Sequence, residues 1–167
     1  MGLFRGAEAV LIKLRMEWEI TISNDGGYCP CCARWGKISP QGMTEARSLA
    51  LLWISRAPKD DGWVNVQKLA PKWILRAKNY SLLKHWGLIE SAVNTEANRR
   101  GSGRWRVTEK GQLFINETLS VPSKVYLYND TVQGWSTDRV YFRDCFGTRF
   151  SYDEVIAENF NWARITL

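Results

Sequence analysis

The chain has 167 residues, a net charge of +6 and an apolar content of 45%. This composition predicts one ordinary domain, or a small domain with appendages, and its nine Trp residues favour a packed core over disorder. No apolar stretch approaches the roughly 20 residues of a membrane-spanning helix, and Glu8 interrupts any secretory signal core. We therefore expect a cytoplasmic protein with no membrane partner.

The N-terminal segment predicts a short helix followed by a strand. Residues 6–16 place apolar side chains at the spacing of an amphipathic helix. In residues 18–23, Trp18, Ile20 and Ile22 alternate with polar residues, which is typical of a strand. The turn residues 24–27 then end this strand.

A cysteine cluster follows that turn. Cys29 and Cys32 have the C-x-x-C spacing of a metal-binding turn, and two such thiolates could share a zinc ion that needs four ligands. An unmetallated turn and a redox site, in which Arg34 and Lys37 favour thiolates, are the open alternatives. The candidates for the missing zinc ligands are Cys31, Cys145, His85 and the same turn of a second protomer.

The middle of the chain predicts two longer helices with short strands around them. Thr44 caps a helix over residues 44–57, and residues 62–66 predict a short strand. One helical turn at 67–70 precedes Pro71, after which residues 73–86 predict a second long helix that Gly87 ends. Two strands joined by a polar loop then follow, and Thr108 opens a last helical turn.

Positive charge concentrates in this middle region. Residues 68–110 contain ten Lys and Arg against three Glu, whereas the remaining residues contain 13 bases and 14 acids. Such a local excess favours contact with phosphates over a general role in solubility.

The tail predicts a small β-meander and a final helix. Residues 121–143 contain three strand-like runs, with turn formers at Asn129 and Asp130. Ser151 and Glu154 form a capping box that predicts a helix start.

The middle region resembles the winged helix–turn–helix DNA-binding domains of bacterial and phage regulators. The likeness covers about residues 44–117 and rests on Leu69 and Ala70, LLKHWGLIE at 82–90, the Arg- and Gly-rich loop at 98–104, and RWRVTEKGQLFI at 104–115. More loosely, the whole chain is similar to small uncharacterised phage proteins with a Cys-Pro-x-Cys knuckle before such a domain.

The resemblance implies an α+β fold in three consecutive parts. Residues 1–43 would hold the N-terminal helix, strand and cysteine knuckle, residues 44–118 the winged helix, and residues 119–167 a β-rich extension with a terminal helix. It also implies a phage-encoded transcriptional regulator that binds double-stranded DNA in the bacterial cytoplasm, as a homodimer formed through the N-terminal helix. The rival interpretation is a protein-interaction module that binds a host protein.

In that family, a helix reads the major groove while the wing reaches the backbone or the minor groove. Here the helix would be residues 73–86 and the wing residues 94–103. The expected DNA-binding residues are Lys72, Arg76, Lys78, Asn79, Tyr80 and Lys84 from the helix region, and Arg99, Arg100, Arg104 and Arg106 from the wing.

The sequence does not predict an enzyme. It has no phosphate-binding Gly-rich loop and no His-Glu-x-x-His motif, and its one histidine leaves no general base beside a nucleophile. The adjacent acids Asp60–Asp61 and Asp153–Glu154 could hold magnesium in a nuclease, but a turn and a helix start explain both pairs.

Overall fold

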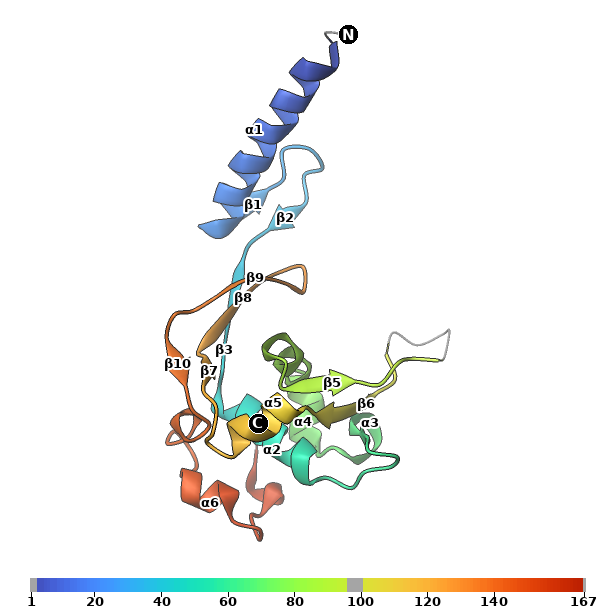
Figure 1. Cartoon of the computed structure of the whole chain (residues 1–167), viewed down its shortest axis with the longest axis vertical. Helices are drawn as coiled ribbons and strands as arrows, with labels where there is room; N and C mark the ends of the chain where they lie inside the picture. The colour runs from blue at the N-terminus through green and yellow to red at the C-terminus, as the bar shows by residue number, and fades with distance from the viewer. Residues whose placement is uncertain (1–2, 96–100, 167) are drawn as a thin grey trace. The chain divides into compact units, whose positions relative to one another are not determined.

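The computed structural model describes residues 3–95 and 101–166. It shows a mixed α+β fold with small antiparallel sheets (Figure 1). In the described part of the chain, no helix combines the length and apolarity needed to cross a bilayer. The chain divides into two compact units, Met1–Gln41 with Val125–Trp135, and Gly42–Lys124 with Ser136–Leu167. The predicted C-terminal extension is therefore shared between the two units.

The first unit combines one long helix with two small sheets. β1 pairs with β2, and β8 lies between β3 and β9 in a three-stranded sheet. The elements are α1 (Leu3–Ser23), β1 (Gly27–Tyr28), β2 (Trp35–Gly36), β3 (Ser39–Gly42), β8 (Lys124–Tyr128) and β9 (Thr131–Trp135).

The predicted strand at 18–23 is wrong, because α1 continues through it to Ser23. Trp18 and Ile22, four residues apart, share a helix face with Leu14, and Ile22 is buried while Ile20 is 62% exposed. The hydroxyl of Thr21 donates to the carbonyl of Glu17 at 2.8 Å, a helical side-chain bond. The apolar alternation therefore arises from two different helix faces.

The predicted turn at Asn129 and Asp130 is confirmed. Both residues have positive φ, 48° and 61°, as a two-residue hairpin turn requires, and Tyr128 pairs with Thr131 across it.

The second unit carries most of the core. Its three-stranded sheet has the order β4–β6–β5, and β7 pairs with β10. The elements are α2 (Glu45–Arg56), β4 (Val64–Asn65), α3 (Val66–Leu69), α4 (Lys72–Ala77), the 3₁₀-helix η1 (Tyr80–Trp86), β5 (Ile89–Ser91), β6 (Arg104–Val107), α5 (Glu109–Ile115), β7 (Val121–Pro122), β10 (Arg139–Val140), η2 (Arg143–Cys145), α6 (Tyr152–Ile156) and η3 (Trp162–Arg164).

The predicted helix at 44–57 is confirmed as α2, with Thr44 as its N-cap. The hydroxyl of Thr44 accepts a hydrogen bond from the backbone N–H of Arg47 at 3.4 Å. Residues 49–54 are all buried, so α2 is covered on every side instead of along one stripe.

The single helix predicted at 73–86 is wrong. α4 ends at Ala77, Lys78 adopts a left-handed conformation with φ 47°, and the chain continues as η1 from Tyr80. Tyr80, Leu83 and Trp86 are buried at a spacing of three, which is the period of a 3₁₀-helix. Gly87, with φ 71°, ends η1 as the sequence predicts.

Thr108 joins the end of η1 to the start of α5. Its hydroxyl donates to the carbonyl of Gly87 at 2.6 Å and accepts from the N–H of Gly111 at 3.0 Å. The ammonium group of Lys110 donates to the carbonyl of Trp86 at 2.7 Å. Thr108, Lys110 and Gly111 therefore account structurally for the VTEKG part of the run at 104–115.

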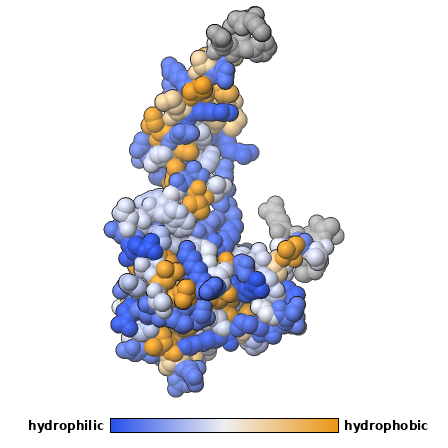
Figure 2. All heavy atoms as spheres, in the orientation of Figure 1, coloured by the Kyte–Doolittle hydropathy of each residue, from blue (hydrophilic) through white to orange (hydrophobic). Residues whose placement is uncertain are grey.

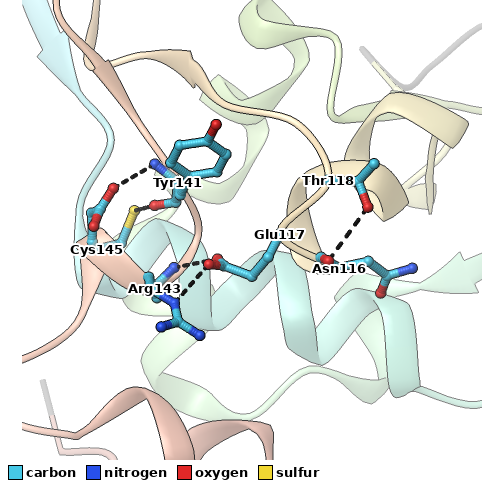
Figure 3. Close-up of polar contacts among 7 residues, drawn as sticks. Asn116, Glu117, Thr118, Tyr141, Arg143 and Cys145 are labelled. Carbon is cyan, nitrogen blue, oxygen red and sulfur yellow. Dashed lines mark hydrogen bonds and ion pairs between the residues drawn. The ribbon is translucent and has the colours of Figure 1, made fainter.

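The tail folds back on α5. Figure 3 shows Arg143 beside Glu117, and the carboxylate accepts hydrogen bonds from the backbone N–H of Arg143 at 2.7 Å and from its Nε at 2.8 Å. The run near residue 140 forms a strand, but it pairs with β7 and does not extend a meander from β9. Ser151 caps α6 as predicted.

Candidate nucleic-acid interface

α4 presents a basic face opposite its buried side. Trp73 and Ile74 are buried, whereas Lys72 and Arg76 are exposed four residues apart and therefore share a face of the helix. Lys78 follows at the left-handed residue that ends α4, and it is exposed as well.

Two hollows adjoin Lys68 and Lys78. One, of about 400 Å³, is lined by Asn65, Gln67, Lys68 and residues 101–103 at the base of the predicted wing. The other, of about 440 Å³, is lined by Gln67, Leu75, Lys78, Tyr80 and Ser81. Because Gln67 lines both hollows, Lys68 and Lys78 border one continuous surface. We call Lys68, Lys72, Arg76 and Lys78 the basic surface.

The cations of the basic surface have no acidic partner within the described ranges. Lys68, Lys72, Arg76 and Lys78 are all exposed, and none of them takes part in an ion pair there. Their charge is therefore available to an anionic ligand.

The two predicted wing arginines on β6 already have acidic partners. Arg104 donates to the backbone carbonyl of Asp60 at 2.8 Å and pairs with its carboxylate at 3.2 Å. Arg106 pairs with Glu90 at 2.6 Å, and its guanidinium lies 4.4 Å from the ring centre of Trp63. These contacts compete with phosphate for both guanidinium groups.

Tyr80, a predicted DNA contact, packs against β6. Its side chain is 6% exposed and lies edge-on to Trp105, with ring centres 5.7 Å apart. Its hydroxyl accepts from Gln67 at 3.3 Å. The ring is therefore a packing element of this surface.

The remaining predicted DNA contacts are placed as follows. Asn79 is half-buried at the junction of α4 and η1, and Lys84 is exposed on η1. Arg99 and Arg100 lie outside the described residues, as does part of the wing predicted at 94–103.

Lys68 and Gln67 are site residues that the sequence reasoning missed. Both belong to α3, a single turn whose N-cap, Asn65, accepts from the N–H of Lys68. The available signal was the position of this turn between a strand and Pro71, which leaves its polar side chains at the surface.

The predicted metal ligands separate between the two units. Cys29, Cys31 and Cys32 belong to the first unit, whereas Cys145 and His85 belong to the second. Within residues 3–95 and 101–166, no group of three or more potential ligands could hold a metal ion. All four cysteines are free thiols.

Cys145 is half-buried, in surroundings that disfavour a thiolate. Its thiol donates to the carbonyl of Tyr141 at 3.6 Å, as Figure 3 shows. Burial raises the pKa of this thiol from 9.0 to about 11. Metal binding requires the deprotonated form, so Cys145 is poorly suited to be a ligand.

The half-buried thiol of Cys145 makes the stability of the protein depend on pH in the alkaline range. Its contribution to the free energy of unfolding is complete below pH 9, where the thiol is neutral in both the folded and the unfolded protein. This contribution is lost as the pH rises toward 11. We expect the free energy of unfolding to fall by about 2 to 3 kcal/mol more in the unmodified protein than in Cys145→Ala over this range.

Urea denaturation at several pH values measures the difference between the two proteins. Other groups titrate equally in both, so their contributions cancel. A difference that stays constant from pH 8 to 11 would contradict the assignment.

Comparison with known proteins finds no family model, no curated protein and no solved structure that matches this chain.

Proposed function

We propose that the second unit binds double-stranded DNA through the basic surface, with α2, α3, α4, η1 and the β4–β6–β5 sheet acting as a winged helix. The proposal rests mainly on the basic surface, whose four exposed cations have no acidic partners in the described ranges. This surface lies next to the base of a loop that contains two more arginines. Cations in this arrangement bind phosphates at adjacent positions of a duplex.

The break after Ala77 changes how such a unit would meet DNA. α4 has six residues and a rise of about 9 Å, so only its exposed face, Lys72 and Arg76, would enter the groove. Asn79, at the end of this short helix, remains the candidate for contact with a base edge, whereas Tyr80 packs against Trp105. Binding of this kind would depend mainly on contacts with the phosphate backbone of the DNA.

The resemblance stated above extends this proposal to the regulation of transcription by a phage-encoded protein. Few base-reading side chains and several phosphate-binding ones favour a large, salt-dependent affinity with modest sequence discrimination. Specificity would then depend on Asn79 and on the loop that carries Arg99 and Arg100.

The test is a titration of duplex binding against salt, measured by fluorescence anisotropy with the full chain and a labelled duplex of random sequence. Lys72→Ala, Arg76→Ala and Lys78→Ala together should reduce affinity by about 100-fold at 0.1 M salt, since each removed contact contributes about 1 kcal/mol. The slope of log affinity against log salt should become shallower by about 2 to 3.

The matched control replaces Arg104 and Arg106 by alanine, since both are already paired with acids. This double variant should change affinity by less than about 3-fold, because both guanidinium groups already donate to protein oxygens and are not free to bind phosphate. Unchanged affinity and slope in the triple variant, or no binding by the unmodified chain, would overturn the proposal.

A second candidate function is protein interaction, which the exposed face of α1 favours. Ile12, Met16 and Ile20 follow one another at a spacing of four and are more than half exposed. Figure 2 shows apolar side chains among hydrophilic ones along this helix. A host protein or a second copy of the chain would be the partner, and absence of duplex binding would make this candidate the stronger one.

A further inference from the structure

The hairpin that joins β1 to β2 holds its cysteines in a tight turn. The N–H of Cys29 donates to the carbonyl of Arg34 at 2.8 Å, and the N–H of Ala33 donates to the carbonyl of Cys29 at 2.9 Å. Ala33 adopts a left-handed conformation with φ 55°, which reverses the chain directly after Cys32. The turn brings Cys29 and Cys32 to the same end of the hairpin.

This turn favours a thiolate at Cys29. Hydrogen bonding from the backbone N–H of Cys31, and then from that of Cys32, lowers the pKa of the Cys29 thiol. The thiols of Cys32 and Cys31 also lie within hydrogen-bonding reach of Cys29. The two backbone donors hold the sulfur of Cys29 in the turn, at the C-x-x-C spacing of a zinc-binding pair.

The residues Cys29 and Cys31 both border α1. With Pro30 they line an apolar hollow of about 60 Å³ against Leu11 and Trp18, whereas Cys32 does not line it. Cys31 and Cys32 are exposed and Cys29 is half-buried. The C-x-x-C spacing, at which two thiolates of one tight turn can share a metal ion, therefore selects Cys29 and Cys32 as the pair.

We infer that Cys29 and Cys32 form half of a tetrahedral zinc site, which the same two residues of a second copy of this chain complete. Zinc in a closed site takes four ligands, and no third candidate ligand joins this pair within the described residues. Cys145 lies in the other unit and keeps its proton. A second hairpin supplies the missing thiolates in the same geometry.

The surface around the turn fits a second copy. Tyr28 and Trp35 flank it as an exposed pair with ring centres 5.2 Å apart, and burying them would add apolar contact area. Four thiolates and one Zn²⁺ carry a net charge of −2, which the exposed Arg34 and Lys37 of both copies would offset. Neither cation takes part in an ion pair within the described ranges.

The first experiment adds Co²⁺ to the reduced, metal-free full chain and follows the thiolate-to-cobalt and visible absorption bands. Saturation is expected at about one cobalt for two chains, with the strong visible bands of a tetrahedral thiolate site. Light scattering after gel filtration should show a dimer with Zn²⁺ and a monomer after EDTA. No thiolate band, or saturation at one cobalt per monomeric chain, would overturn the inference.

The second experiment uses matched serine variants, with circular dichroism to verify that each is folded. Cys29→Ser and Cys32→Ser should each lose the cobalt bands and the zinc-dependent dimer. Cys31→Ser and Cys145→Ser should keep both. Equal loss of the cobalt bands in Cys31→Ser and Cys32→Ser would contradict the assigned pair. The cobalt titration of the unmodified protein remains a valid test even where a variant does not fold. None of these measurements involves DNA, so the zinc site and the duplex interface succeed or fail separately.

Discussion

Replacing Gly111 by alanine is expected to destabilise the second unit by about 3 kcal/mol or more. A Cβ atom at this position would lie 2.2 Å from the carbonyl oxygen of Leu88 and 2.6 Å from Cγ1 of Val107. That carbonyl accepts from the N–H of Thr108 at 3.0 Å, so it cannot move without breaking a hydrogen bond next to β5. The contact is with backbone, which cannot rotate away as a side chain would.

The expected loss of stability in Gly111→Ala is opposite in sign to the effect of helix propensity. Gly111 lies inside α5, where alanine alone would favour the helix by about 1 kcal/mol. Urea denaturation followed by circular dichroism measures the net result. Gly101→Ala is the matched control, since a Cβ there meets no atom within 4 Å, and it should change stability by less than about 0.5 kcal/mol. A Gly111→Ala protein as stable as the unmodified one would contradict the close approach of α5 to Leu88.

Helix starts and tight turns could be predicted from the sequence because they depend on local chemistry. Thr44, Thr108 and Ser151 each cap the helix that they were expected to cap. Asn129 and Asp130 form the expected hairpin turn. In each case a short polar side chain satisfies backbone groups only a few residues away, or tolerates a left-handed conformation, without help from the rest of the chain.

The wrong predictions of a strand at 18–23 and of one helix at 73–86 share one cause, which is a period read from too few residues. Trp18, Ile20 and Ile22 fit a strand, but Trp18 and Ile22 also fit one face of a helix. The run from Trp73 to Trp86 fits one long helix, yet Lys78 interrupts it and the burial changes to a spacing of three. Packing of Tyr80 on Trp105, a partner 25 positions away, selects the second arrangement.

The candidate site could be predicted only where it depends on local charge. The cations of α4 were expected at the surface and lie there. The acids that neutralise Arg104 and Arg106 are set by the pairing of β6 with its neighbours, so strand register decides their identity. Asp60 precedes β4 and Glu90 pairs directly with Arg106 in β5. Counting charges along the sequence does not reveal these ion pairs.

Replacing Trp86 by alanine is expected to cost about 3 to 5 kcal/mol of unfolding free energy. The side chain is 1% exposed at the end of η1, and its indole N–H donates to the carbonyl of Pro122 at 2.8 Å. Removal of the ring leaves a large cavity and also leaves the carbonyl of Pro122 without this donor. Denaturation in urea, followed by circular dichroism because the chain contains eight other Trp residues, measures the loss.

Two further variants divide this loss into its parts. Trp86→Phe keeps most of the ring volume but removes the donor to Pro122, so it should cost about 1 to 3 kcal/mol. Trp35→Ala removes the same side chain from a position that is 53% exposed and should cost less than about 1 kcal/mol. The expected order of stability is therefore Trp35→Ala, then Trp86→Phe, then Trp86→Ala. If Trp86→Ala were no less stable than Trp35→Ala, the indole would not be the link between η1 and β7, and the base of the proposed DNA-binding unit would have to be held by other residues.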